Sequence, residues 1–277
     1  MVSRLPLLIL LLLLTTAVSR AATQGCLRCH PPHYSGEGSC CSCHRGDDRT
    51  DRKRIAHNGL IRARYAAFTL PGSDRVARGK RLLERFGCRR CHTADRQGTT
   101  LAASLDRLRE KSPEELAWAI DHPAMHMPRF RFAETERDDL VNYLLWLGRD
   151  IRGGGKETPL VIHFVGKEQD DEHPFVKRCG GCHKGLTESL GGLGRGAMGP
   201  NLSALFTPFY PRQYREGEPW NPQRLREWLK NPRKVRPLAV MPPVVPEQGE
   251  GERIAELLTV KGVNAGNTLP QPAAGNR

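Results

Sequence analysis

One pentapeptide, Cys-x-x-Cys-His, occurs four times in this chain of 277 residues and contains eight of its nine cysteines. The four copies are Cys26-Leu27-Arg28-Cys29-His30, Cys40-Cys41-Ser42-Cys43-His44, Cys88-Arg89-Arg90-Cys91-His92 and Cys179-Gly180-Gly181-Cys182-His183. In a helical segment this spacing puts the two thiols about one turn apart, with the histidine directly after them. The chain therefore repeats one small local site, and any fold must accommodate four of them.

Covalent attachment of haem is the chemistry that requires this spacing. Two thiols one turn apart can form thioethers to the two vinyl groups of one haem, and the adjacent imidazole can then bind its iron. A structural zinc site would need four ligands around one metal, and it would not explain a histidine after every pair. We therefore expect four covalently attached haem c groups rather than zinc or disulfides.

Cys41 is the ninth cysteine and lies inside the second pentapeptide. An unpaired cysteine in an exported protein is either shielded and inert, or available for an intermolecular disulfide or regulation. The inert alternative is favoured here, because the adjacent haem would cover the thiol.

The first 22 residues resemble a secretory signal, with Arg4, a leucine-rich stretch over residues 5–14 and small residues at Ala21 and Ala22. The apolar run is shorter than the ~20 residues of a spanning helix, so an uncleaved membrane anchor is the weaker alternative. We expect export, to the periplasm or alternatively to the cell surface. Membrane association would then require an uncleaved signal or a complex.

The formal charge of the chain is +13, of which two arginines of the signal supply a small part. In an exported protein such a balance favours redox partners with acidic docking surfaces over nucleic acid, or is simply a solvated surface. Hydrophobic residues make up only 38% of the chain, so haem is expected to fill part of the interior.

The spacing of the pentapeptides predicts a dihaem segment followed by two monohaem domains. The expected ranges are a signal at 1–22, a dihaem segment at 23–70, a domain at 71–152, a linker at 153–168, a second domain at 169–262 and a disordered tail at 263–277. The fold class is mainly α, with two small helical domains and an irregular, haem-cored N-terminal segment.

Residues 71–150 resemble a class I cytochrome c domain. Ser73 begins an expected helix with apolar residues at helical spacing, Ser112-Pro113-Glu114-Glu115 begins a second, and Leu140, Val141, Tyr143, Leu144 and Leu147 follow a third. In this family the first and last helices cross, with a small residue against an aromatic one. The resemblance implies that Gly79 meets Tyr143 or Trp146.

Residues 169–262 resemble the same family less closely, because the opening helix is short and the aromatic partner is missing at the end. Helices are expected near 170–178, 222–229 and 251–260. The run Gly191-Gly192-Leu193-Gly194 lacks the context of a phosphate-binding motif and is expected to be a loop.

The resemblance implies methionine ligands in both monohaem domains, because the family places proline after its ligand methionine. His92 would pair with Met127 and His183 with Met241, each methionine preceding a proline. Met125 and His126 compete with Met127, and Met198 competes with Met241.

The dihaem segment has no methionine, so its second axial ligands must be of another type. With His30 and His44 as proximal ligands, His33 and His57 are the remaining histidines. We expect them to be the distal ligands, although the residues alone do not tell which serves which haem. A surface histidine is the alternative for each.

Thioether sulfur raises the potential of haem iron relative to a second imidazole, so the sequence predicts two lower and two higher potentials. An electron carrier between exported redox proteins is the favoured function, and enzymatic activity is the less favoured one. The alternatives are a haem reductase or peroxidase with one open haem, and the cytochrome subunit of a larger oxidoreductase.

Overall fold

The computed structural model describes residues 25–108, 111–124, 126–149 and 172–264. The chain is mostly helical with a few short strands, as the sequence predicts for cytochrome c-like helical domains. It divides into two compact units, residues 1–62 and residues 63–277, and each is treated by itself below. Within the described residues no helix has the length and apolar character needed to cross a membrane.

The first unit contains the 3-10 helix η1 (Gly25–Arg28) and the short helices α2 (Cys40–His44) and α3 (Lys53–Ala56). Ser39 caps α2, because its side chain accepts a hydrogen bond from the Ser42 amide at 3.3 Å. Of residues 25–62, only Gly25 and Ile61 are buried. A segment with so little buried apolar surface needs another source of cohesion, in agreement with the expected irregular segment.

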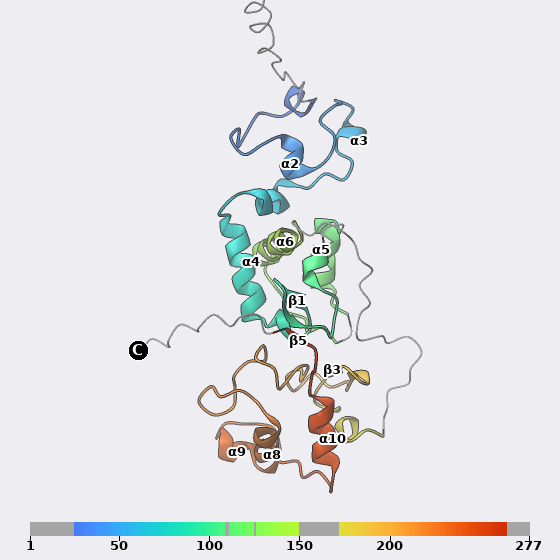
Figure 1. The fold of residues 1–277 in the computed structure, drawn as a ribbon, viewed down its shortest axis with the longest axis vertical. Coiled ribbons are helices and arrows are strands. Elements are labelled where there is room, and N and C mark those ends of the chain that lie inside the picture. Colours follow the sequence, from blue (N-terminus) through green and yellow to red (C-terminus); the bar gives the residue numbers. More distant parts are fainter. Residues whose placement is uncertain (1–24, 109–110, 125, 150–171, 265–277) are drawn as a thin grey trace, which may run out of the picture. The chain divides into compact units, whose positions relative to one another are not determined.

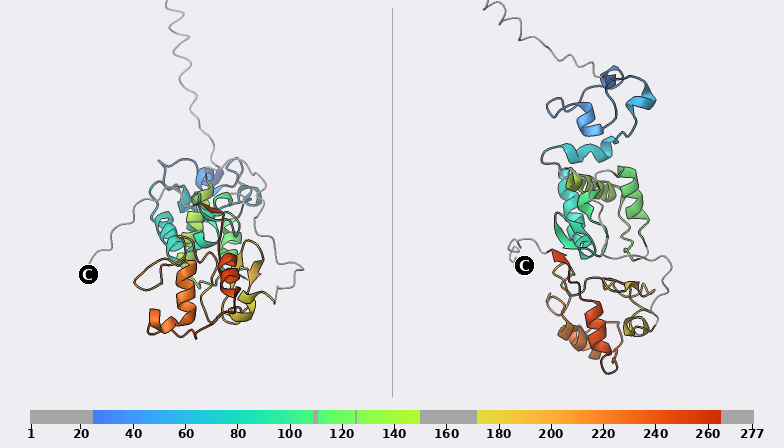
Figure 2. Two further views of the ribbon diagram at one scale, coloured as in Figure 1. Left: turned by 60° about the horizontal axis from the view of Figure 1, so that its bottom comes forward. Right: turned by 45° about the vertical axis from the view of Figure 1, so that its right-hand side comes forward.

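In the second unit, α4 (Asp74–Arg85) and α6 (Glu134–Gly148) cross and pack against each other (Figures 1 and 2). A Cβ added to Gly79 would lie within 2.7 Å of Tyr143 Cβ and would overlap Asp139 O. Only glycine permits this close approach of the two helices. The predicted contact of Gly79 with Tyr143 is therefore confirmed.

Helix α5 (Pro113–Asp121) begins where the sequence predicts, with a capping box formed by Ser112 and Glu115. The 3-10 helix η2 (Ala63–Thr69) packs on α6, and the Asn142 side chain donates a hydrogen bond to Arg64 O at 2.8 Å. By these contacts residues 63–69 belong to the second unit, whereas the sequence pattern grouped them with the dihaem segment. The physical reason is that Tyr65 of η2 is buried in the second unit, so η2 contributes apolar surface to the core of that unit.

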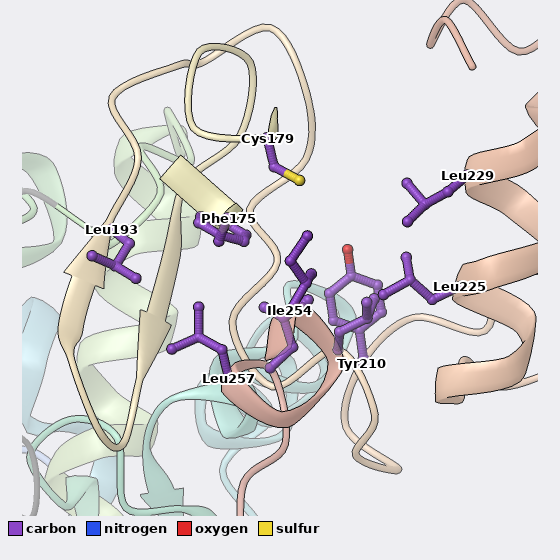
Figure 3. Packing of buried hydrophobic residues seen from close by; sticks show 10 residues of the cluster. Phe175, Cys179, Leu193, Tyr210, Leu225, Leu229, Ile254 and Leu257 are labelled. Atoms are coloured by element: carbon purple, nitrogen blue, oxygen red, sulfur yellow. The ribbon is translucent and has the colours of Figure 1, made fainter. Parts of the chain in front are cut away.

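The rest of the second unit is built around a core of α7 (Pro174–Arg178), α8 (Pro222–Lys230) and α10 (Glu250–Leu257), followed in Figure 1 by their labels or colours. Figure 3 shows Phe175 from α7 among Leu225 and Leu229 of α8 and Ile254 and Leu257 of α10. In the pair formed by the opening helix α7 and the closing helix α10, the aromatic residue, Phe175, is therefore on α7. The short helix α9 (Pro232–Val235) follows α8 directly.

Short strands and 3-10 turns complete the fold. Strands β1 (Thr93–Ala94) and β2 (Gln97–Thr99) form an antiparallel hairpin between the 3-10 helices η3 (Cys88–Arg90) and η4 (Leu105–Arg107). Strand β5 (Val263–Asn264) pairs with β2, and β3 (Gly185–Thr187) pairs with β4 (Gly191–Leu193).

Two expectations are wrong at these strands. Gly191-Gly192-Leu193 forms β4 rather than a loop, because the Thr187 hydroxyl bonds Gly191 O at 2.9 Å and closes a hairpin. Residues 263–264 were assigned to a disordered tail, but they pair with β2. The signal at 1–22, the linker at 153–168 and the tail beyond residue 264 lie outside the described residues.

Candidate haem sites

Each pentapeptide folds into one tight turn that gathers its two cysteines and its histidine. In three copies the histidine amide donates to the carbonyl of the first cysteine: His30 to Cys26 at 3.0 Å, His92 to Cys88 at 3.0 Å and His183 to Cys179 at 2.9 Å. The remaining copy, the second pentapeptide, is helix α2 itself. None of the nine cysteines is joined to another by a disulfide. The turn geometry that thioether attachment requires is thus present at all four copies.

The histidine rings are oriented by backbone carbonyl groups. Nδ1 of His44 lies 2.9 Å from Ile61 O, Nδ1 of His92 lies 2.7 Å from Ala103 O, and Nδ1 of His183 lies 2.8 Å from Pro200 O. A carbonyl only accepts, so Nδ1 carries the proton and Nε2 keeps its lone pair. These three rings are therefore fixed in the tautomer that binds a metal through Nε2.

The thiols of the third and fourth copies do not resemble redox-active Cys-x-x-Cys pairs. Burial raises the pKa of Cys88 to about 11 and the pKa of Cys179 to about 11. Disulfide-exchange sites lower the thiol pKa instead, because the thiolate is the reactive form. Attachment to a group, rather than exchange chemistry, fits these cysteines.

In the first unit, the structure pairs the four histidines that the sequence could not pair. His33 Nε2 lies 3.5 Å from His44 Nε2, with ring centroids 5.7 Å apart. The rings of His30 and His57 have centroids 6.0 Å apart and an interplanar angle of 42°. Each pentapeptide histidine of this unit therefore has one non-motif imidazole opposite it.

An apolar cavity of about 510 Å³ adjoins the fourth pentapeptide. Its lining includes Cys179, Cys182, His183, Met198, Trp220, Trp228, Arg236, Leu238, Val240 and Met241. This volume falls within the range of small-molecule and cofactor sites in proteins. Both thiols, the imidazole and the thioethers of Met198 and Met241 thus line a single space.

Two further observations show that the residues around this cavity fit a haem. Trp220 Nε1 is buried and has no hydrogen-bond partner among the described residues, and Arg236 lines the same cavity. A propionate would satisfy both groups. Leu238 and Val240 line the cavity, yet their side chains are 94% and 92% exposed. The apolar ring of a haem bound in the cavity would cover them.

The two candidate methionines of this domain are placed differently. Met198 is 84% exposed, and the next residue, Gly199, packs directly against the His183 ring. Since Pro200 O also binds His183 Nδ1, this segment lies against the histidine itself. Met241 is half-buried, packs on the core and receives a hydrogen bond from Trp228 Nε1 to its Sδ at 3.0 Å.

Near the third pentapeptide, a cluster of aromatic rings connects residues 127–132, which begin with Met127, to the helix end that precedes Cys88. Phe86, two residues before Cys88, has its ring centroid 5.3 Å from Phe130 and 4.7 Å from Phe132. Met127 is half-buried and begins this segment. Met125 lies outside the described residues.

His126, the other competitor of Met127, faces a different part of the unit. Its ring packs against Gly192 of β4, and Asn201 Nδ2 donates to its backbone carbonyl at 3.0 Å. Burial and the charge of Lys184 lower the pKa of this imidazole, which keeps it neutral. This ring therefore packs against the chain around β4, rather than beside the third pentapeptide.

Arg90 connects the third pentapeptide to the loop that orients His183. Its guanidinium donates to Asn201 O at 2.6 Å and to Ser203 O at 3.3 Å, and lies 4.5 Å from the centroid of the Tyr210 ring. Asn201 directly follows Pro200, the acceptor of His183 Nδ1. No sequence pattern predicts this contact of Arg90 with the chain around Asn201, nor the positions of Trp220 and Trp228 beside the cavity.

Comparison with known families identifies one segment. The family model described as "Cytochrome C oxidase, cbb3-type, subunit III" matches residues 74–144, which span α4 to most of α6. No curated protein and no solved structure matches the chain significantly. Residues 74–144 are therefore a c-type cytochrome domain, which implies covalently bound haem c and electron transfer with redox-protein partners.

Proposed function

We propose that this chain is an exported tetrahaem c-type cytochrome that carries electrons between redox proteins. The observation that carries the proposal is the orientation of the pentapeptide histidines. His44, His92 and His183 each contact a carbonyl oxygen through Nδ1, at 2.9, 2.7 and 2.8 Å, which leaves the Nε2 lone pair available to bind a metal. Haem c, when bound, supplies reversible one-electron chemistry.

In the first unit we assign His33 and His44 to one haem and His30 and His57 to the other. Two imidazole nitrogens that bind one metal from opposite sides are about 4 Å apart, because each metal–nitrogen bond is about 2 Å. The 3.5 Å between His33 Nε2 and His44 Nε2 is close to this value. The 6.0 Å separation of the His30 and His57 rings is similar to the 5.7 Å of the first pair.

In the second unit we assign Met127 as the partner of His92 and Met241 as the partner of His183. Two of the competitors are less suited: the ring of His126 packs against Gly192, and Met198 is exposed and precedes Gly199, the residue that packs against the His183 ring. Two imidazole ligands give a lower potential than one imidazole and one thioether. Electrons would then enter through the first unit and leave through the second, or the first unit would exchange with a low-potential partner.

A role as the cytochrome subunit of a larger oxidoreductase is the second candidate. The matching family model describes a subunit of an oxidase, and it covers the segment around the third pentapeptide. In this case the catalytic centre would lie on another chain, and the basic charge of +13 would favour acidic surfaces on that chain or on mobile redox proteins. Stable co-purification with a second chain would distinguish this candidate from a free carrier.

The test is to purify the holoprotein from an export-competent host and to measure its mass and spectra. The proposal predicts four haems per chain, a cleaved signal, four low-spin haems and no carbon monoxide binding by the reduced protein. A high-spin haem that binds carbon monoxide would contradict the carrier and point to reductase or peroxidase activity. A redox titration in which all four haems share one potential would contradict the directional scheme.

A further inference from the structure

The side chains of Trp228 and Met241 form a direct contact inside the cavity beside the fourth pentapeptide. Trp228 Nε1 donates a hydrogen bond to Met241 Sδ over 3.0 Å. Both residues line the cavity of about 510 Å³ together with Cys179, Cys182 and His183. The contact therefore lies within the site to which we assign a haem.

The fold fixes the position of this indole from several sides. Trp228 is in the last turn of α8, whose neighbouring residues Leu225 and Leu229 are buried in the core. The Trp220 ring lies edge-to-face with it, with centroids 5.5 Å apart and an interplanar angle of 83°. The donor thus points in a direction set by helix packing rather than by a mobile side chain.

The methionine segment is tied to the same helix. The Val244 amide donates to Leu229 O at 2.8 Å, which holds the chain after Met241 against the end of α8. Met241 itself packs on the core cluster that contains Leu225 and Leu229. Residues 228 and 241, on different elements, are thereby kept at a constant separation.

An indole N–H is only a donor, and a thioether sulfur is a weak acceptor with two lone pairs. A sulfur that binds iron with one lone pair can still accept a hydrogen bond with the other. Such a bond withdraws electron density from the sulfur and weakens its donation to ferric iron more than to ferrous iron. Hydrogen bonds to the side chains that bind a metal are an established means by which proteins orient those side chains and shift potentials.

We propose that Trp228 is a positioning residue for Met241, which holds the ligand sulfur in place and raises the potential of the haem bound at Cys179 and Cys182. The inference rests on the proposed function, because it takes Met241 as the axial partner of His183. The neighbouring Trp220, whose Nε1 has no partner among the described residues, serves the propionate end of the same cavity instead. The two tryptophans therefore have separate roles.

The test compares wild-type and Trp228→Phe full-length holoprotein. Phenylalanine keeps an aromatic ring against Trp220 but removes the N–H donor. Because only part of the hydrogen-bond energy differs between the two oxidation states, the reduction equilibrium constant of one haem should fall about threefold. At about 59 mV per tenfold change for one electron, this is a decrease of about 28 mV. The other three haems should keep their potentials.

Imidazole binding to the ferric protein supplies a second readout, which reports on the sulfur–iron bond itself. Loss of the hydrogen bond should strengthen sulfur donation to ferric iron, so added imidazole should remove the far-red sulfur-to-iron band of this haem only at a severalfold higher concentration. Trp118→Phe is the matched control, because Trp118 is 64% exposed on α5 and stacks on His122 rather than lining the cavity. It should change neither the potential nor the imidazole affinity.

Unchanged potential and unchanged imidazole affinity in Trp228→Phe would overturn the inference while leaving Met241 as a ligand. A separate result would contradict the assignment of Met241 as a ligand: Met241→Ala would then leave the far-red band as strong as in the wild type. Nuclear magnetic resonance of the reduced wild-type protein decides the matter even when the variant does not fold. The Trp228 indole proton should exchange slowly and contact the Met241 methyl group, and rapid exchange without that contact would also overturn the inference.

Discussion

His33 Nε2 and His44 Nε2 face each other across 3.5 Å, although His33 lies in the loop before the small helix α2 and His44 is the last residue of that helix. His44 is oriented by its Nδ1 contact with Ile61 O at 2.9 Å, so the same nitrogen that faces His33 is the one with a free lone pair. This relationship supports our proposal that these two imidazoles bind one metal and that His30 and His57 bind another.

Replacing His33 by alanine should open one haem of the first unit. We expect about a quarter of the total haem to become high-spin and to bind carbon monoxide when reduced, because one of the four irons loses its sixth ligand. Electron paramagnetic resonance and difference spectra measure both effects. His57→Ala should open the other haem of this unit in the same way. In the double variant, about half of the total haem should become high-spin and bind carbon monoxide.

The matched control for these variants is His122→Ala. His122 stacks on the exposed ring of Trp118 and lies in no candidate site. An unchanged spectrum in His33→Ala, or an equal response in His122→Ala, would show that His33 is not a ligand.

Met241→Ala should remove the far-red sulfur-to-iron band of one haem and lower its potential, whereas Met198→Ala should leave both unchanged. The reason is placement: Met198 is 84% exposed and precedes Gly199, which packs against the His183 ring, whereas Met241 is half-buried and accepts a hydrogen bond from Trp228. Spectroelectrochemical titration of the two holoproteins makes the comparison. The opposite pattern would make Met198 the ligand.

Gly79→Ala should destabilise the second unit by about 1–3 kcal/mol, the usual cost of overpacking. The added Cβ would overlap Asp139 O and lie within 2.7 Å of Tyr143 Cβ, forcing α4 and α6 apart. Chemical denaturation followed by circular dichroism measures the free energy of unfolding. Gly36→Ala is the control, because a Cβ there would have nothing within 4 Å, and equal stability of the two variants would refute the crossing geometry.

Cys41 should be unreactive toward alkylation in the native protein. In the denatured protein, the number of alkylated cysteines should report how many pentapeptides carry haem. Burial, with a smaller contribution from Asp48, raises the pKa of Cys41 to about 11, so at pH 8 the thiol stays protonated and only a small thiolate fraction can react. Raising the pH toward 11 should accelerate alkylation. Iodoacetamide treatment with mass spectrometry should find no adduct on the native holoprotein at pH 8.

After denaturation at the same pH, one adduct per chain is expected, because four haems occupy the other eight cysteines. Three or more adducts would mean that at least one pentapeptide carries no haem. Rapid labelling of the native protein at pH 8 would contradict the shielding of Cys41.

Arg90→Ala should weaken the association of the two monohaem segments. The change removes hydrogen bonds to Asn201 O and Ser203 O and the contact with the Tyr210 ring, and we expect a loss of about 1–3 kcal/mol. Arg90→Lys should fall between, since lysine keeps the charge but loses the planar donor geometry. Hydrogen exchange at residues 199–205 should rise in Arg90→Ala, and unchanged protection would contradict the role of this bridge.

The sequence by itself determined the chemistry and much of the helical framework. Cys-x-x-Cys-His is a local code, because one turn of chain brings its thiols and imidazole together, and its four copies could be recognised without a fold. Ser112-Pro113 predicted the start of α5, and the spacing of Leu140, Val141 and Leu144 predicted α6, because caps and periodicity are also local. Even the contact of Gly79 with Tyr143 followed from the resemblance to the class I domain.

Only the tertiary structure decided which distant residues meet. Nothing local pairs His33 with His44, joins Arg90 to Asn201 or places Trp228 Nε1 on Met241 Sδ. Strands β4 and β5 were missed for the same reason: a glycine run and a two-residue strand carry no periodic signal, and they form only because Thr187 and β2 supply hydrogen-bond partners. Ligand pairs and their orienting groups are long-range relationships, fixed by packing and hydrogen bonding across the fold.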